Sequence, residues 1–163
     1  EDLLNQLDND ISAYNEIIVT DNQVLNIILQ EKWYYCKKHD VKLTMNVNPN
    51  AFSQVTNTDL YTLVGNIIDN AIEAVMQIQN KEKRIISIDI TDKKGLSTIV
   101  CNNYFQGEIQ YDKENKTFIT HKSDKISHGL GIKSIELLAR KYDGISKINI
   151  DDNVFTITVS IPN

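Results

Sequence analysis

The sequence predicts an α+β domain in which helices stack on one face of a mixed, mostly antiparallel sheet, and three observations support this prediction. Short alternating segments occur in two pairs, each joined by a turn sequence, at 84–102 and at 145–161. A long stretch, 58–80, carries apolar residues at helical spacing. Hydrophobic residues make up 41% of the 163 residues, which is enough for one core between helices and a sheet.

Composition excludes several classes of protein. The formal net charge of −5 disfavours nucleic-acid binding, because an acidic surface repels backbone phosphates. No apolar run approaches the roughly 18–20 residues that a membrane span needs, and no signal peptide opens the sequence. Cys36 and Cys101 lie far apart and match no zinc spacing, so we expect buried thiols in a reducing compartment.

Residues 1–19 predict a helix separate from the main domain at 20–163. Its apolar residues recur with spacings of 3, 4, 3 and 4, typical of the seam of a coiled coil or helical hairpin. A helix with so narrow an apolar stripe cannot bury it alone, so we expect a partner helix. Packing back onto its own domain is the alternative. The seam consists of Leu4, Leu7, Ile11, Tyr14 and Ile18.

The helices and strands of 20–163 are predicted from the spacing of apolar residues and from capping and turn residues. Thr20 and Gln23 form a capping box that predicts a helix running to about Cys36. From 103 to 128 the chain is polar and poorly periodic, which is typical of a lid or functional loop. The other predicted elements are a strand at 42–47, a helix at 58–80, strands at 84–90 and 96–102 joined at 93–95, a helix after Gly131 that stops at Asp143-Gly144, and strands at 145–150 and 154–161.

Polar residues form a stripe beside the apolar face of the long helix. Asn66, Asn70, Glu73 and Gln77 fall within an arc of roughly 60°. The chain has 18 Asn, so an Asn pair four residues apart means little by itself. The 66/70 pair differs because it lies in a strongly apolar helix, where asparagine costs stability. A carboxamide oxygen can coordinate a hard cation, and its NH2 group can donate to phosphate. An ordinary solvated face is the alternative.

Glycines stand between the polar segment and the last predicted helix, in His128-Gly129-Leu130-Gly131. They allow successive backbone N–H groups to converge on an anion, and the helix dipole adds to this attraction. Lys122, just upstream, could reach a terminal phosphate as a point charge. The segment matches neither the Rossmann nor the Walker pattern. A simple turn and a solvated charge run are the alternatives.

Together and in this order, these segments resemble the Bergerat-fold, or GHKL, ATP-binding superfamily. Asn66 to Ala74 resembles its N box, and Thr120 to Asp124 followed by His128 to Ile135 resembles its G2 box and approach. The combination is similar to the catalytic domain of sensor histidine kinases of the accessory-gene-regulator and virulence-sensor, quorum-sensing type. The resemblance extends to residues 1–19, which look like the second helix of a dimerisation domain.

The resemblance implies an enzyme that binds ATP with Mg²⁺ and transfers the γ-phosphoryl group to a histidine outside this chain. It implies catalytic roles for Asn66 and Asn70, with Asn70 holding Mg²⁺. In the hydrolysing branch the position of Asn66 carries a Glu base; an amide takes no proton at neutral pH, which favours phosphoryl transfer over hydrolysis. The implied ATP-binding residues are Asn66, Asn70, Glu73, Asn102, Lys122, His128, Gly129, Leu130 and Gly131.

One box of the family departs from its usual form. The Asp-x-Gly-x-Gly segment after a strand is missing, and Val100 to Phe105 stands in its place. Asn102 could accept a hydrogen bond from the adenine amino group, and Asn103 is the competing choice. A neutral acceptor bonds more weakly than a carboxylate, so we expect modest ATP affinity.

The resemblance also implies partners and a location. They are a phosphoacceptor-His domain of the same or a partner subunit, a response regulator, and a second copy in a homodimeric full-length receptor. The domain would be cytoplasmic and reach the membrane only through upstream segments. The alternatives are an anti-sigma-type serine kinase of the same fold and a nucleotide-independent interaction module.

Overall fold

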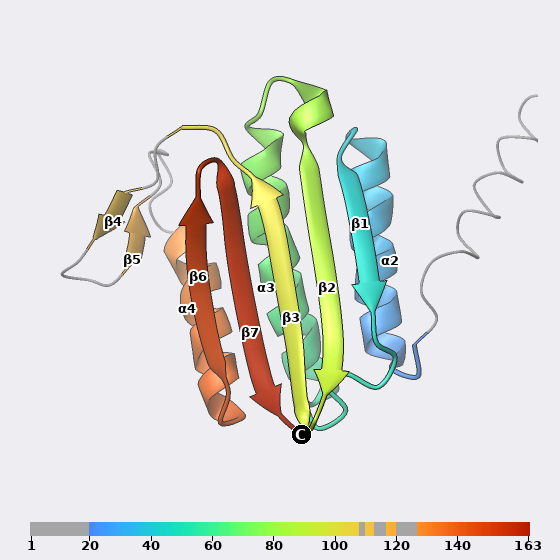
Figure 1. Ribbon diagram of the computed structural model, residues 1–163. Coiled ribbons are helices and arrows are strands. Elements are labelled where there is room, and N and C mark those ends of the chain that lie inside the picture. Colours follow the sequence, from blue (N-terminus) through green and yellow to red (C-terminus); the bar gives the residue numbers. More distant parts are fainter. Residues whose placement is uncertain (1–19, 108–109, 113–116, 120–126) are drawn as a thin grey trace, which may run out of the picture.

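A five-stranded mixed sheet forms one layer of the protein (Figure 1). The structure is a computed structural model that describes residues 20–107, 110–112, 117–119 and 127–163. The helix predicted at 1–19 lies outside these residues. The strand order is β1-β2-β3-β7-β6, with β1 parallel to β2 and every other pair antiparallel. The strands are β1 (Lys42–Val47), β2 (Ile85–Lys93), β3 (Leu96–Tyr104), β6 (Ile145–Asp151) and β7 (Val154–Pro162).

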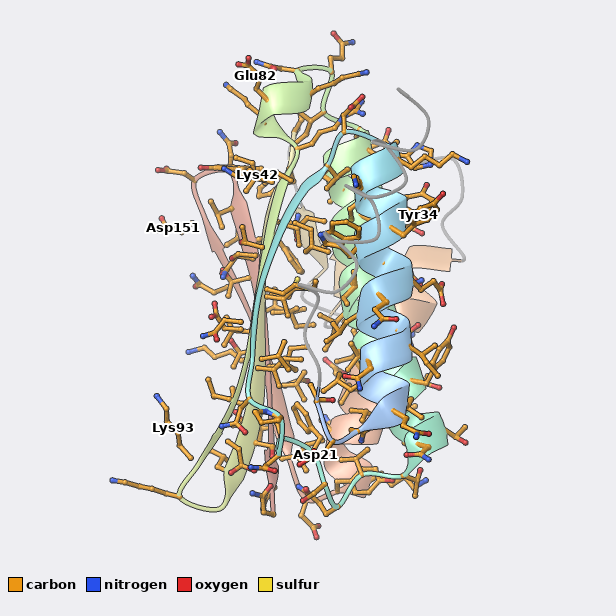
Figure 2. All side chains as sticks on the ribbon, turned by 90° about the vertical axis from the view of Figure 1, so that its right-hand side faces the viewer. Asp21, Tyr34, Lys42, Glu82, Lys93 and Asp151 are labelled. Atoms are coloured by element: carbon orange, nitrogen blue, oxygen red, sulfur yellow. The ribbon has the colours of Figure 1, made fainter. Side chains whose placement is uncertain are left out.

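Three helices cover one face of this sheet, which confirms the predicted α+β fold (Figure 2). They are α2 (Gln23–Lys38), α3 (Asn57–Met76) and α4 (Ser127–Lys141). A one-turn 3₁₀ helix, η1 (Lys81–Lys83), links α3 to β2. A small separate hairpin, β4 (Gln110–Asp112) with β5 (Thr117–Ile119), lies within the segment predicted to be a loop. Among the described residues, no helix is long and apolar enough to cross a membrane.

The core lies between the sheet and the helices. Burial alternates along β2, so Ile86, Ile88 and Ile90 point to the helices and are at most 1% exposed. Each fully buried side chain of this size contributes about 1.5–3 kcal/mol. The central helix, α3, supplies most of the facing surface. Its buried residues are Leu60, Leu63, Val64, Gly65, Ile67, Ile68, Ala71, Ile72 and Val75.

Helix ends differ from their predicted positions. The N-cap of α2 is Asn22 rather than Thr20, because the Asn22 side chain accepts hydrogen bonds from the N–H groups of Val24 and Leu25. Thr20 is instead held by the Asn26 side chain, which bonds both its N–H and its carbonyl. The predicted capping box is therefore wrong, because the better-placed Asn acceptor takes the cap position.

The other two boundary errors concern α3 and α4. α3 ends at Met76, not at 80. The next N–H groups make tighter hydrogen bonds to the carbonyl three residues back, from Gln77 to Ala74 and from Ile78 to Val75. α4 begins at Ser127, before the two glycines that were predicted to precede the helix. Both predictions of the element itself are confirmed.

The stop predicted at Asp143-Gly144 is confirmed and has a steric cause. After α4 the chain enters β6 through Gly144, whose N–H donates to Ala139 O at 2.8 Å. A Cβ atom at residue 144 would lie 2.4 Å from Ser160 O, closer than real Cβ atoms come to backbone. Only glycine fits where this corner passes β7.

Candidate functional site

The two asparagines of the polar stripe lie one helical turn apart on α3. Asn66 and Asn70 are both half-buried. A Cβ atom built on Gly131 would lie 3.2 Å from Asn70 Oδ1 and 3.5 Å from its Nδ2. The Asn70 carboxamide therefore lies directly against the backbone of the glycine segment, in the space that a larger residue at 131 would fill. The structure brings these two sequence motifs together.

The Asn70 amide nitrogen is buried and, among the described residues, has no hydrogen-bond partner. An unpaired buried donor costs about 1–3 kcal/mol, and such groups in native proteins call for a physical explanation. A ligand oxygen beside Gly131 would satisfy the donor. The residues present thus fit a ligand rich in acceptor oxygens, such as a phosphate chain.

The glycines lie in the first two turns of α4 instead of in a loop. This corrects their predicted local structure, yet it leaves them at a helix N-terminus. The N–H groups of the first turn, that of Gly129 included, have no acceptor within the helix, and the helix dipole adds positive potential there. His128, Leu130 and Gly129 occupy this turn; the side chains of 127–130 lie outside the described part of the structure, as does Lys122.

Glu73 continues the stripe of Asn66 and Asn70 and is exposed on α3. Gln77 comes at the C-cap of the helix. The described residues contain no group of three or more His, Cys, Asp or Glu able to hold a metal ion. Mg²⁺ is commonly held by one or two protein oxygens together with substrate phosphates, and the Asn70 Oδ1 atom suits such a site.

The two candidates for the adenine contact, Asn102 and Asn103, lie on opposite faces of the sheet. Asn102 points to the outer face of the sheet, where its Nδ2 donates to Ser87 Oγ (3.2 Å) and its Oδ1 accepts from Thr156 Oγ1 (2.7 Å). Asn103 points to the face covered by the helices and is 4% exposed. Asn102 therefore faces away from the helices that carry the other candidates, and Asn103, the competing choice, faces them.

The sequence could not settle this choice because both phases of β3 looked plausible. Cys101 and Ile99 are apolar and buried on the inner face, but Val100 is apolar too and lies on the outer face with Asn102. Strand alternation gives a reliable phase only when one face is clearly polar.

An ion pair beside Asn70 had no signal in the sequence. Lys32 of α2 lies 2.9 Å from Asp69 and 3.2 Å from Glu31. Burial opposes the charge on Lys32, but these two carboxylates outweigh it, and the pKa of Lys32 is raised. The pair fixes α2 to α3 at the residue that precedes Asn70.

Comparison with known proteins agrees with this arrangement of fold and motifs. Residues 55–162 match the family model described as GHKL domain, which is more than half of the chain. The five-stranded mixed sheet with helices on one face is the fold of this class of domain. The chain belongs to the GHKL domain family. No curated protein matches the sequence.

Solved structures of histidine kinases share the fold. The catalytic domain of histidine kinase ThkA, in a nucleotide-free form, is 18% identical with a TM-score of 0.65, over 88% of this chain and 93% of that one. A further nucleotide-free form, with 1,2-propanediol, is 16% identical with a TM-score of 0.60, over 85% and 93%. The Acinetobacter baumannii histidine kinase AdeS is 12% identical with a TM-score of 0.57, over 99% and 79%. At these identities the likeness concerns the fold.

Proposed function

We propose that this chain is the ATP-binding catalytic domain of a sensor histidine kinase, which transfers the γ-phosphoryl group of ATP to a histidine outside the chain. The observation that carries the proposal is the buried Nδ2 of Asn70, which has no hydrogen-bond partner within the described part of the chain and lies against Gly131 near the start of α4. Membership of the GHKL family and the shared fold of histidine kinase catalytic domains support it.

The roles of the residues follow from their chemistry. Asn70 donates its Nδ2–H to a phosphate oxygen or offers Oδ1 to Mg²⁺, and the N–H groups of the first turn of α4 face the same phosphates. Mg²⁺, when bound, supplies charge neutralisation. We also assign Asn66, Lys122 and His128 to the triphosphate, and Glu73 to the same ATP–Mg²⁺ site. Phosphoryl transfer needs mainly such positioning and charge stabilisation.

Two positions set the character of the reaction. Asn66 cannot accept a proton at neutral pH, so no base at this position activates water, and ATP hydrolysis by the domain is slow. Asn103, on the covered face of β3, offers its carbonyl oxygen to the adenine amino group. A neutral acceptor there gives modest ATP affinity.

The wider setting is part of the same proposal. We assign the domain to a quorum-sensing or virulence receptor that is homodimeric, membrane-anchored by other segments, and cytoplasmic at this end. Its partners are the phosphoacceptor-His domain of the same or a partner subunit and a response regulator. Residues 1–19 serve as a dimerisation-domain helix.

Calorimetric titration with a non-hydrolysable ATP analogue and Mg²⁺ tests the proposal. Asn70→Ala removes a bond to a charged group worth about 1.5–3 kcal/mol and should weaken binding roughly ten- to a hundredfold. Asn46→Ala is the matched control, because Asn46 is exposed on β1, where its Nδ2 donates to Asp89 Oδ1 of β2 at 3.3 Å. Equal binding by both variants, or no binding by the wild type at millimolar nucleotide, would refute the assignment.

The neighbouring pair on β3 gives a second matched comparison. Asn103→Ala should weaken binding of the ATP analogue, and Asn102→Ala should not. The two changes are chemically identical and differ only in the face of the sheet. The opposite order would return the adenine contact to Asn102.

A further inference from the structure

The two helices that carry the candidate site contact each other at both ends. α3 and α4 pack together and run in opposite directions (Figure 1). At one end Asn70 lies against Gly131. At the other end, the residues after α4 reach the N-terminus of α3. The second contact involves no residue of the proposed nucleotide site.

Four residues, Thr56, Asp59, Lys141 and Tyr142, make this second contact, and we call them the α3–α4 clamp. Asp59 Oδ2 accepts hydrogen bonds from the hydroxyl of Tyr142 and from Thr56 Oγ1 at 3.0 Å, and lies 2.7 Å from Lys141 Nζ. The Tyr142 hydroxyl also accepts from the Thr56 N–H at 3.1 Å. Because Thr56 is the N-cap of α3, the end of α4 is tied to the first turn of α3.

The spacing of the two contacts is the same on both helices. Asp59 precedes Asn70 by 11 residues, and Gly131 precedes Tyr142 by 11 residues. Eleven residues of helix are about three turns, or about 16 Å, so Asp59 and Asn70 fall on one face of α3. Tyr142, directly after the last residue of α4, comes about the same distance from Gly131. The clamp and the Asn70–Gly131 contact are therefore two rungs between antiparallel helices. A slip or rotation of α4 at the clamp displaces Gly131 from Asn70.

The apolar packing between the rungs is less directional than the hydrogen bonds of the clamp. The residues in between include Leu63 and Ile67 on α3 and Ile135 and Ala139 on α4, all buried. Burial of apolar surface is by itself non-directional, and close packing limits how far the two helices can slide. Hydrogen bonds to a carboxylate are short and directional, so the clamp adds a defined register to this packing.

We propose that Asp59 and Tyr142 are positioning residues for nucleotide binding: the clamp holds α4 in the register that puts the Gly131 backbone against the Asn70 amide. This inference rests on the proposed ATP-binding function. A purely structural clamp would change the stability of the domain and leave the dissociation constant of the folded protein unchanged.

Tyr142→Phe tests the proposal, and Tyr61→Phe is its matched control. Both remove one hydroxyl, but the Tyr61 hydroxyl donates to Glu31 of α2 and belongs to no contact of the clamp. At a temperature where every variant is folded, Tyr142→Phe should bind the ATP analogue three- to tenfold more weakly, and Tyr61→Phe should match the wild type. Lys141→Gln, at a side chain 58% exposed, is a milder second variant that should shift affinity in the same direction. Unchanged affinity in both clamp variants overturns the proposal.

Two further readouts separate positioning from general destabilisation. In the Asn70→Ala background, Tyr142→Phe should cause little further loss of affinity, although the sites are too far apart to couple directly. Full additivity would contradict the proposal. In nucleotide-free protein, NMR signals of the Gly131 amide and the Asn70 carboxamide should shift in Tyr142→Phe only. This spectrum tests the clamp even if the wild type binds no nucleotide, so the two proposals fail separately.

Discussion

Replacing Gly131 by alanine should separate the stability of the domain from its affinity for nucleotide. Gly131 is the fifth residue of α4 and has no positive φ, so alanine fits its backbone. Alanine in a helix is about 1 kcal/mol better than glycine. For a domain of this size that gain raises the melting temperature by about 2–4 °C.

The same methyl group acts against the site. It would lie 3.2 Å from Asn70 Oδ1, tighter than ordinary van der Waals contact, so the carboxamide must turn or move. If the carboxamide loses its bond to a charged phosphate, binding weakens by about 1.5–3 kcal/mol. The dissociation constant then rises roughly ten- to a hundredfold. We therefore expect a variant that melts no lower than the wild type and binds the ATP analogue far more weakly.

Gly65→Ala is a closely matched comparison. A Cβ at residue 65 would also lie 3.2 Å from a neighbour, but that neighbour is the flexible end of Ile28 in the core. Its affinity for nucleotide should stay within about twofold of the wild type by the same hydrogen-bond reasoning. Calorimetric titration and thermal melts measure both quantities. If Gly131→Ala binds nucleotide as tightly as Gly65→Ala, the contact with Asn70 has no role in binding.

Two predictions concern titratable groups. The hydrogen bonds from Lys141 and Tyr142 lower the pKa of Asp59 from 3.8 to about 2, so its stabilising effect is complete above about pH 4 and is lost as the pH falls towards 2. Melting temperatures measured from pH 5 to pH 2 should fall more steeply for the wild type than for Asp59→Asn, and parallel curves would contradict the assignment. Burial raises the pKa of Cys36 to about 11 and that of Cys101 to about 12, so iodoacetamide at pH 8 should label both thiols slowly until the protein is unfolded. Mass spectrometry of labelled native protein checks this, and labelling at the rate of a free thiol would show that the native thiols are accessible.

The sheet and helices could be predicted because their periodicities are strong. The inward isoleucines of β2 alternate without interruption, and α3 has a continuous apolar face. Helix ends depend on which of several nearby side chains reaches the cap, and sequence gives no distance. Asn22 therefore replaced Thr20 at the start of α2.

The candidate site was predictable only where both partners carried a motif. Asn70 and the glycine segment each stood out, and their meeting followed from the resemblance to a known family. The choice between Asn102 and Asn103 stayed open because Val100 obscured the phase of β3. The α3–α4 clamp could not be predicted from the sequence. Asp59 and Tyr142 are residue types common on protein surfaces, and their pairing depends on how two helices far apart in the sequence pack.

The two glycines at the ends of α4 would behave differently under selection. At Gly144 any side chain meets the Ser160 carbonyl, so every substitution depletes the folded protein itself. At Gly131 the neighbour is the amide of Asn70, so we expect a small side chain to leave the protein abundant but to weaken its binding of nucleotide. In a saturation library scored for both protein abundance and signalling output, substitutions at residue 144 would resemble those of core residues, which lower abundance. Substitutions at residue 131 would resemble those of the proposed nucleotide-binding residues, which lower output alone. Invariance of a glycine among natural sequences would not by itself distinguish the two cases.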